Sequence, residues 1–418
     1  MRTVIKKIIG KSPLVAKKSL IYLYETYFKY ICLIKECGEY KIKKSTSREI
    51  HPKKMILLYH ISGLSFGGTE KNLQVIANNL CDDFEVFFLY SDKNVENSRL
   101  DYIDKKVHCI KFNYTEKESK FPFYIKGMNP HIKNVIAENK IDLLITADSG
   151  YTQYPINTMT NIPIIMINIF GSPTLQKNIV TNIFISKAVQ KHAEEYTGSR
   201  AGNLSLFIPI LILSNHNSEK ERGKQIRKEF GISDNDFVFG RIGRNADSIF
   251  DPIGIRSFQK ILKEFPKAHY IIMSSPPILA KIVHDENIPN VHFLPPSGDE
   301  LSIWGFHYAI DCLAHFRYDG ETFGLNIAES MYAGNPIISH RSHIWNAHTE
   351  YLSSSFARVA KEDDVEMFAS YMKEFISIKE NDPVLWKKMK TSANASAEKN
   401  FSEKEYTKKI KEILKEIF

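Results

Sequence analysis

The sequence predicts an α/β protein made of two doubly wound domains in tandem, preceded by a basic amphipathic leader. The chain has 418 residues, more than a single hydrophobic core usually serves. It is globular in composition, with 43% hydrophobic and 25% charged residues. From Met55 onward, short apolar runs alternate with helical patterns, which is typical of parallel α/β architecture. The predicted parts are a leader (1–54), an N-terminal domain (55–212), a C-terminal domain (213–395) and a closing helix (396–418).

Each predicted domain begins with a buried strand. In the first, a strand at 55–61 precedes a helix that starts after Gly67 and Gly68, and further strands are expected at 84–90, 141–146, 162–168 and 182–186. A polar linker at 214–224 separates this series from strands at 237–243, 268–273, 291–294, 309–316, 336–339 and 356–360. Asp251 and Pro252 are expected to begin the first helix of the second series, and the Ser402–Glu405 spacing to begin the last helix. The carboxyl ends of both sets of strands are expected to face one cleft, where ligands bind.

The leader carries most of the positive charge. Residues 1–54 hold 14 Lys and Arg against 4 Glu, a balance of +10, so the remainder nets −2 from the total of +8. Apolar residues between Leu20 and Ile34 follow helical spacing, which predicts contact of residues 1–50 with an anionic membrane surface, or packing on the protein's own body. No apolar run is long enough for a spanning helix, and lysines interrupt any signal-peptide core. Nucleic-acid binding is not predicted, because the folded body is not basic.

Cysteine and histidine give no metal or redox signal in the sequence. The five cysteines are scattered without a C-x-x-C pair, which favours a reducing, cytosolic location. His340, His343 and His348 are closely spaced but lack an accompanying carboxylate or cysteine pattern. No metal site is therefore predicted.

The stretch "DGETFGLNIAESMYAGNPII" (319–338) indicates a phosphate site. A strand leads into a loop, and the helix that follows offers unpaired N–H groups to an anion. These groups are expected at Phe323, Gly324, Leu325 and Asn326. Glu321 would point toward the group attached to the phosphate, and Glu329 would accept both hydroxyls of a ribose. The alternative is a surface loop carboxylate and a solvated helix residue.

The same stretch resembles the E-x7-E motif of retaining GT-B glycosyltransferases of the family 4 type. Both glutamates, the Phe-Gly-Leu, the glycine and the proline stand at the expected places, while Ser330 and Tyr332 replace small alanines. The resemblance covers about residues 55–415, through "ISGLSFGGTEKNLQVIANNL", "IFISKAVQKHAEE" and "FVFGRIGR". The leader lies outside it.

This resemblance implies a GT-B fold and a nucleotide-diphospho-sugar donor, UDP- or GDP-linked, with no further cofactor and no bound metal. It implies that Glu329 binds the ribose, that Glu321 lies beside the transferred sugar, and that Arg241 neutralises the diphosphate. A guanidinium suits that role because it stays charged and grips two oxygens. The family's lysine after this arginine is absent, and Arg244 is its nearest substitute or an exposed loop residue.

One further departure from the family and one match concern the N-terminal domain. Where many relatives carry a histidine near the acceptor, this chain has Asp148 and Ser149, which are expected to contact the acceptor or, equally, to cap a loop. Gly67 and Gly68 are expected to let the backbone approach the donor phosphate, with an ordinary tight turn as the alternative.

The sequence thus predicts a retaining, metal-independent hexosyltransferase-type enzyme. It would move a sugar from the donor to a glycan or lipid-linked glycan acceptor of the surface polysaccharide type, in the cytoplasm and peripheral to the inner face of the membrane. The alternative is a non-catalytic nucleotide-sugar-binding or scaffold subunit of a membrane-associated glycan assembly complex. The missing lysine and histidine favour that alternative, and the presence of both glutamates argues against it.

Overall fold

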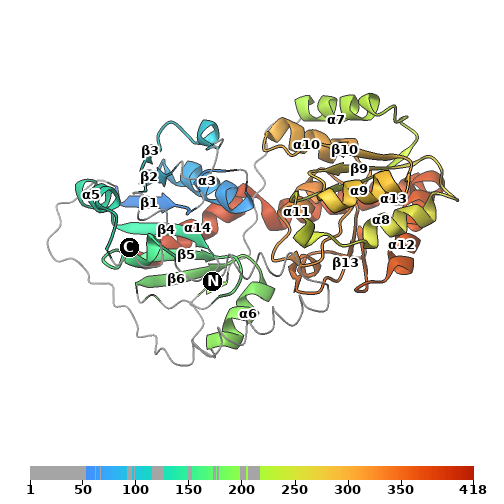
Figure 1. Cartoon of the computed structure of the whole chain (residues 1–418). Coiled ribbons are helices and arrows are strands. Elements are labelled where there is room, and N and C mark those ends of the chain that lie inside the picture. Colours follow the sequence, from blue (N-terminus) through green and yellow to red (C-terminus); the bar gives the residue numbers. More distant parts are fainter. Residues whose placement is uncertain are drawn as a thin grey trace. The chain divides into compact units, whose positions relative to one another are not determined.

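The computed structural model describes residues 53–61, 63–65, 67–91, 97, 99–114, 127–148, 153–172, 176, 178–197, 204–205 and 217–418. Residues 1–52 of the predicted leader and Ser149 lie outside these residues. The described chain divides into two compact units, one of residues 53–205 with 403–418 and the other of residues 217–402 (Figure 1). No helix in the described segments is long and apolar enough to cross a membrane.

The first unit is built on a parallel sheet of seven strands in the order β3-β2-β1-β4-β5-β6-β7. Its strands are β1 (Met55–Tyr59), β2 (Glu85–Tyr90), β3 (His108–Lys111), β4 (Leu143–Asp148), β5 (Ile164–Asn168), β6 (Ile179–Phe184) and β7 (Leu204–Ser205). The chain order reverses between β1 and β4, which defines a doubly wound sheet. The two edge strands β3 and β7 were not predicted, because β3 is largely exposed and β7 has only two residues.

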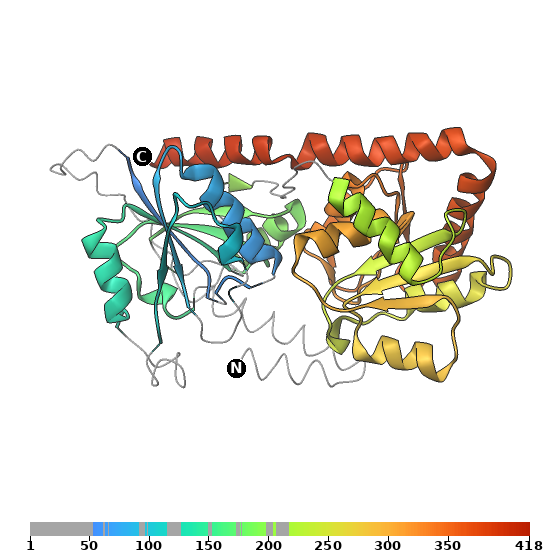
Figure 2. The same cartoon turned by 90° about the horizontal axis from the view of Figure 1, so that it is seen from above.

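Helices cover both faces of this sheet. They are α3 (Gly68–Leu80), α5 (Pro130–Glu138), α6 (Lys187–Thr197) and α14 (Glu403–Ile417), with short 3-10 turns η1 (Leu100–Tyr102) and η3 (Ile156–Thr158). Ile132 and Val135 of α5 join the cluster that contains Leu57 and Leu144, and α3 lies on the opposite face (Figure 2). Successive strand residues point to opposite faces, so the fully apolar strands serve both helix layers.

The end of the chain completes this first unit rather than the second. The α14 hydroxyl of Tyr406 donates to Asn72 of α3, and Asn79 of α3 donates to Glu403 at 2.6 Å. The preceding helix α13 runs from Pro383 to Phe401 and ends at an extended residue, Ser402. The predicted boundary between residues 395 and 396 therefore falls inside a helix, because the break in backbone conformation comes seven residues later.

The second unit is built on six parallel strands in the order β10-β9-β8-β11-β13-β15. They are β8 (Phe237–Ile242), β9 (Ala268–Met273), β10 (Val291–Leu294), β11 (Cys312–Ala314), β13 (Ile337–His340) and β15 (Ala357–Ala360), beside a small pair, β12 (Gly320–Glu321) and β14 (Trp345–Asn346). The order again reverses, between β8 and β11. The prediction of doubly wound parallel α/β units is confirmed for both.

The helices of the second unit are α7 (Asn217–Glu229), α8 (Ile253–Ile261), α9 (Pro277–Asp285), α10 (Glu300–Ala309), α11 (Leu325–Tyr332), α12 (Val365–Asn381) and α13, with η5 (Asp247–Ile249) and η6 (Ala347–Glu350). Two predictions need correction. The linker at 214–224 is helical from Asn217, because α7 needs to bury only Gly223 and Ile226 and leaves its polar residues outside. The strand predicted at 309–316 is three residues long, since Ala309 still belongs to α10.

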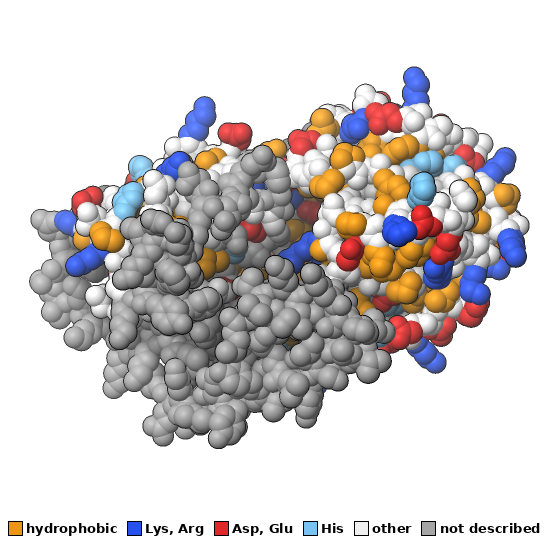
Figure 3. Space-filling view, viewed as in Figure 1, with side chains coloured by type: hydrophobic (Ala, Val, Ile, Leu, Met, Phe, Trp, Pro, Cys, Tyr) orange, Lys and Arg blue, Asp and Glu red, His pale blue; other side chains and the backbone are white. Residues whose placement is uncertain are grey.

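In the second unit, the charged residue Arg241 lies next to the apolar core. Phe237 and Phe239 of β8 pack with Phe258 of α8 and Phe368 of α12. Because side chains alternate along a strand, Arg241 points to the same face as these two phenylalanines. On the outer surface shown in Figure 3, by contrast, basic and acidic side chains are interspersed with apolar ones over this unit.

Candidate functional site

Arg241 lies at the carboxyl end of β8, where the sheet reverses its order. β8 pairs with β9 on one side and with β11 on the other, and ligands of open α/β sheets bind at such a switch point. The Arg241 side chain is fully buried, with its guanidinium carbon 5.2 Å from the centre of the Phe316 ring. This stacking supports the cation but supplies no counter-charge.

The Arg241 guanidinium is poorly paired for a buried cation. Its one hydrogen bond is a long one, 3.5 Å from Nη1 to the carbonyl oxygen of Ser274, and Nε and Nη2 have no partner among the described residues. Burial lowers the pKa of Arg241 to about 10, so the group remains charged at neutral pH. Gly243 keeps space beside it, because an added Cβ there would lie 3.0 Å from Nη2. Glu321 and Asp319 offset part of this buried charge, and the unused hydrogen-bonding capacity of the guanidinium favours an anion beside it.

Glu321 follows β11 on a loop that only glycine can form. Gly320 has a φ of +67°, and a Cβ at that position would lie 1.8 Å from the carbonyl oxygen of Trp345. This close approach allows β12 to pair with β14, with Glu321 opposite Asn346. The Glu321 side chain is only 13% exposed, so its surroundings decide whether it carries a charge.

Two basic side chains from the same loop hold Glu321 ionised. Nε2 of His315 lies 3.2 Å from Oε1 of Glu321, and Nη1 of Arg317 lies 3.5 Å from both carboxylate oxygens. Burial raises the pKa of Glu321, but the charge of Arg317 and the contact with His315 outweigh burial and bring this pKa to about 2. Arg317 is held in turn by Asp319, whose Oδ2 accepts from Nη2 at 2.9 Å. The carboxylate of Glu321 is therefore fixed and negative at neutral pH.

Asn326 sets the orientation of His315. Its amide nitrogen donates to the carbonyl of Ile242 at 2.7 Å and lies 3.4 Å from Nδ1 of His315. If Nδ1 accepts this proton, the ring carries its own hydrogen on Nε2, which faces Glu321. Burial lowers the pKa of His315, so the ring is neutral at pH 7.

His340 and His348 hold the loop of His315 and Arg317 in place through hydrogen bonds to the backbone. Nε2 of His340 accepts from the backbone N–H of Arg317 at 3.2 Å, while Nδ1 contacts the carbonyl of Arg341 at 3.0 Å. His348 in turn contacts the carbonyl of His340 through Nε2 at 3.2 Å. Burial lowers the pKa of His340 to about 3 and that of His348 to about 4. Both rings are neutral hydrogen-bonding supports.

Helix α11 begins beside this loop with open N–H groups. Gly324, its N-cap residue, has a φ of +90°, a conformation that favours glycine. Its carbonyl and that of Phe323 accept from the hydroxyl of Tyr351 at 3.2 and 2.7 Å. No acceptor for the N–H groups of Leu325 and Asn326 is found within the described chain. These groups and the helix dipole make the start of α11 suited to an anion.

Glu329 lies further along α11, buried at 5% exposure. Its Oε2 is 3.7 Å from Nε2 of His307, a fully buried residue of α10. The structure thus separates the two glutamates: Glu321 belongs to the loop with Arg317, and Glu329 to the interface of α10 and α11. The contact of Glu329 with a ribose stays a prediction.

The remaining predicted residues are distributed as follows. Arg244 is exposed in the loop after β8 and forms no ion pair with another described residue. In the first unit, Gly67 and Gly68 begin α3, and the carboxylate of Glu70 lies so close that a Cβ on Gly67 would be 2.0 Å from it. Asp148 is the buried last residue of β4. The ligand roles of these residues stay predictions.

Sequence reasoning missed His315, Arg317 and His307. A signal was present for the first two, because polar residues directly after a strand in a parallel sheet lie at the ligand-binding edge. His307 gave none, since a histidine within an apolar helix is ordinarily a core residue. Together, the described groups offer a buried cation at the end of β8 and, after the neighbouring strand β11, an ionised carboxylate and an open helix start. This arrangement can bind an anionic group and hold a negative charge beside it.

Comparisons with known proteins agree with this fold. No protein-family model and no curated protein matches the chain. Among solved structures, a glycosyltransferase from Rickettsia africae ESF-5 is 16% identical, with a TM-score of 0.66 over 88% of this chain and 99% of that one. HepE of Anabaena in complex with UDP is 16% identical, with a TM-score of 0.66 over 87% and 100%; it was also solved with UDP-glucose. Sucrose-phosphate synthase of Thermosynechococcus elongatus is 13% identical, with a TM-score of 0.65 over 88% and 99%.

At such low identity, the similarity establishes the fold and no more. The matches span nearly the whole of each solved chain and both units of this one. The chain therefore has a GT-B fold with two Rossmann-like units, as the sequence predicts.

Proposed function

We propose that this protein is a glycosyltransferase that takes a sugar from a nucleotide-diphospho-sugar. The observation that carries the proposal is the fully buried Arg241, whose Nε and Nη2 have no partner in the described chain. Its position at the switch point of the sheet is where a diphosphate would compensate the charge. The solved relatives that were captured with UDP and UDP-glucose support this class of donor.

The residues present fit the chemistry of sugar transfer. When the bond between the sugar and the diphosphate breaks, negative charge grows on the leaving nucleoside diphosphate and positive charge grows on the sugar. Arg241 and the open start of α11 would stabilise the first of these charges. Glu321, held ionised by Arg317, would stabilise the second.

The finer parts of the proposal rest on the sequence. The match of residues 319–338 to the E-x7-E motif supports a retaining mechanism of the family 4 type that needs no metal in the transfer step, with Glu329 on the ribose. The basic amphipathic leader supports a glycan or lipid-linked glycan acceptor of the surface polysaccharide type, reached in the cytoplasm from the inner face of the membrane. A UDP- or GDP-sugar is the proposed donor.

A donor panel tests the enzyme and its carboxylate together. Purified full-length protein is titrated with UDP-, GDP-, ADP- and CMP-sugars by calorimetry, and release of free nucleotide is followed. One donor is expected to bind and to be hydrolysed slowly. In Glu321→Gln, hydrolysis should fall at least about 100-fold with the Kd changed only a few-fold, since the lost interaction forms mainly in the transition state.

The matched control is Glu398→Gln, an exposed carboxylate on α13, which should leave both quantities unchanged. If no donor binds, the proposal is wrong. If a donor binds but hydrolysis and transfer are absent in the wild type, the scaffold alternative replaces the enzyme. Deletion of residues 1–50 with unchanged binding to anionic liposomes would remove the membrane part alone.

A further inference from the structure

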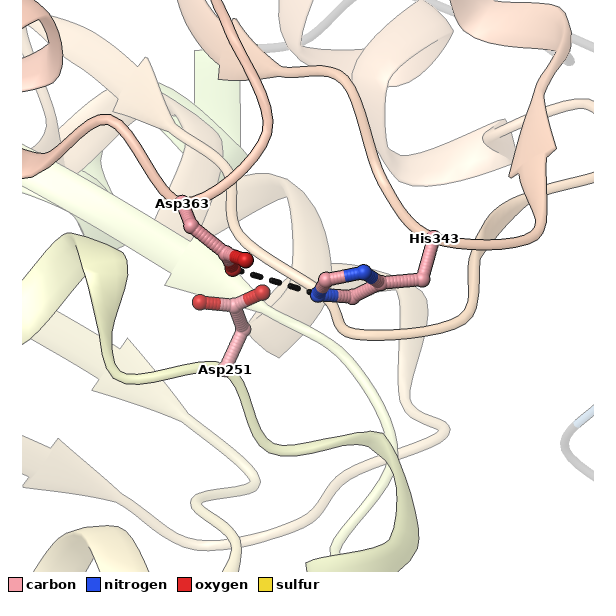
Figure 4. A group of neighbouring side chains, drawn as sticks. All are labelled: Asp251, His343 and Asp363. Carbon is pink, nitrogen blue, oxygen red and sulfur yellow. Dashed lines mark ion pairs between the residues drawn. The ribbon is translucent and has the colours of Figure 1, made fainter. Parts of the chain in front are cut away.

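Three side chains from separate loops of the second unit meet at one point. Asp251 lies in the connection between β8 and α8, His343 follows β13, and Asp363 follows β15. Each offers one ligand atom, and these atoms lie within 4.8 Å of one another. Figure 4 shows both carboxylates turned toward one ring nitrogen of His343. Because the three strands are parallel, their following loops share one edge of the sheet.

Asp251 is a buried carboxylate, and one of its oxygens accepts no hydrogen bond from the described part of the chain. It is 2% exposed, and its Oδ1 accepts from the backbone N–H of Ile253 at 2.9 Å. The other oxygen, Oδ2, has Nε2 of His340 at 4.0 Å. That nitrogen cannot donate to Asp251, because it already accepts from the N–H of Arg317. A buried carboxylate left in this state favours the approach of a cation.

His343 is positioned as a ligand rather than as a surface group. Its side chain is 2% exposed and lies against Tyr318, with 4.3 Å between ring centres. Oε1 of Glu362 contacts Nδ1, and Oδ1 of Asp363 lies 3.2 Å from Nε2. If Glu362 takes the Nδ1 proton, the lone pair of Nε2 faces a carboxylate. A proton or a metal cation between Nε2 and this carboxylate makes the contact favourable.

From these contacts we infer that Asp251, His343 and Asp363 bind one divalent transition-metal cation of the Zn²⁺ type. Neither aspartate forms an ion pair with a lysine or arginine of the described chain, so the site has charge available for a cation. One imidazole nitrogen with two carboxylate oxygens suits Zn²⁺, whereas Mg²⁺ and Ca²⁺ prefer oxygen ligands alone. Glu362 then acts on the imidazole as the outer carboxylate that orients a ligating histidine.

The required adjustment is small. Zn²⁺ with ligands at about 2.1 Å in tetrahedral geometry separates ligand atoms by about 3.4 Å, and water completes the fourth position. Oδ1 of Asp363 is already 3.2 Å from Nε2 of His343, and its side chain, 63% exposed, can adjust its position. Asp251 and His343 stay in place as the buried part of the site.

The cation would have a structural role. The backbone N–H of His343 donates to Tyr318 at 3.1 Å, and the chain after His343 forms β14, which pairs with the strand of Glu321. A metal at His343 therefore ties this loop to the start of α8 and to the β15–α12 loop. The metal site does not depend on the proposed function. Only the consequence of the metal for catalysis, through the position of Glu321, rests on that function.

Metal binding to the full chain tests the inference without any activity assay. The protein is stripped with a chelator and titrated with Zn²⁺, and Co²⁺ is added separately to read the ligand field by visible absorption. We expect one Zn²⁺ per chain at this site, a higher Tm with Zn²⁺, and no comparable effect of Mg²⁺. Asp363→Asn and His343→Gln should each weaken binding by roughly 100-fold or more, and Glu362→Gln by about 10- to 100-fold.

The fold accommodates these substitutions. Asp363 has a φ of +59°, and asparagine tolerates this left-handed conformation as well as aspartate does. Glu366→Gln, an exposed carboxylate nearby with a 77% exposed side chain, is the matched control and should bind Zn²⁺ as the wild type does. The absence of saturable Zn²⁺ binding would overturn the inference. So would binding that survives in both Asp363→Asn and His343→Gln, which would locate the metal elsewhere, for example at Cys32 or Cys37.

Discussion

Replacing Arg241 by methionine should make the ligand-free protein more stable while it abolishes nucleotide binding. Methionine keeps an unbranched apolar side chain that can remain against Phe316. The change removes a fully buried guanidinium whose Nε and Nη2 have no partner in the described chain. Most core substitutions destabilise a protein, so a gain in stability here would be an uncommon and specific result.

The size of the gain follows from the pKa of Arg241. Burial lowers this pKa from 12.5 to about 10, which costs the folded state on the order of 3 kcal/mol at neutral pH. The sign is that of a base with a depressed pKa, so the cost is complete at pH 7, begins to fall as the pH rises through about 10, and is gone only above 12.5. Loss of the stacking on Phe316 destabilises the variant by about 1 kcal/mol and reduces the gain accordingly. The net expectation is a stabilisation of about 1–2 kcal/mol, or a rise in Tm of roughly 2–8 °C.

Urea unfolding without ligand and calorimetry with UDP measure the two effects on the same preparations. Arg256→Met is the control, since Arg256 is paired with Glu286 on the surface; it should change stability by less than about 1 kcal/mol and leave UDP binding intact. A clear destabilisation by Arg241→Met would refute the reasoning. It would mean that the guanidinium is already compensated within the protein and that no anion is needed.

Three further predictions concern the same unit. Because the pKa of Glu321 is lowered from 4.5 to about 2, its stabilisation is complete above about pH 4.5 and is lost toward pH 2; Arg317→Gln should cost about 2–3 kcal/mol at pH 7 and progressively less in acid, as read by urea unfolding across pH 3–7. Gly324→Ala should cost about 1–3 kcal/mol in thermal unfolding, since its Cβ would lie 2.9 Å from the hydroxyl of Tyr351; Tyr351→Phe should relieve part of this cost in the double variant, and strict additivity would contradict the contact. Asp311→Asn should cost about 2–4 kcal/mol by urea unfolding, because it removes the charge that pairs with Lys379 at 2.7 Å; a neutral effect would show that the pair contributes nothing.

The alternation of strands and helices could be predicted from the sequence because apolar residues recur with different periods in strands and in helices. The strand from Met55 is a continuous apolar run and the strand from Phe237 begins with one, and both begin where they were predicted. In the first unit the edge strand β3 could not be predicted in this way, because it is mostly exposed and has no buried face to leave a pattern. The helix α7 was mistaken for a linker because it fully buries only Gly223 and Ile226, while its remaining contacts come from polar side chains such as Arg227.

The candidate site was only half readable, for a related reason. Glu321 was found because it belongs to a contiguous motif with fixed spacing. The groups that set its charge, His315 and Arg317, were not found, because a pKa depends on distances in space and on burial. The group of Asp251, His343 and Asp363 illustrates the same limit more strongly, since its members are separated by 92 and 20 positions in the sequence and meet only through the sheet order.

The return of α14 to the first unit has a consequence for how the protein is made. The N-terminal unit lacks its final helix until residues 217–402 have been synthesised, which takes roughly 10–40 s at about 5–20 residues per second. During that time the side chains of α3 that contact α14, such as Asn72, lack their hydrogen-bonding partners. The second unit, whose described residues are contiguous, can complete its own core first. The order of synthesis and the order of completion are therefore reversed in this chain.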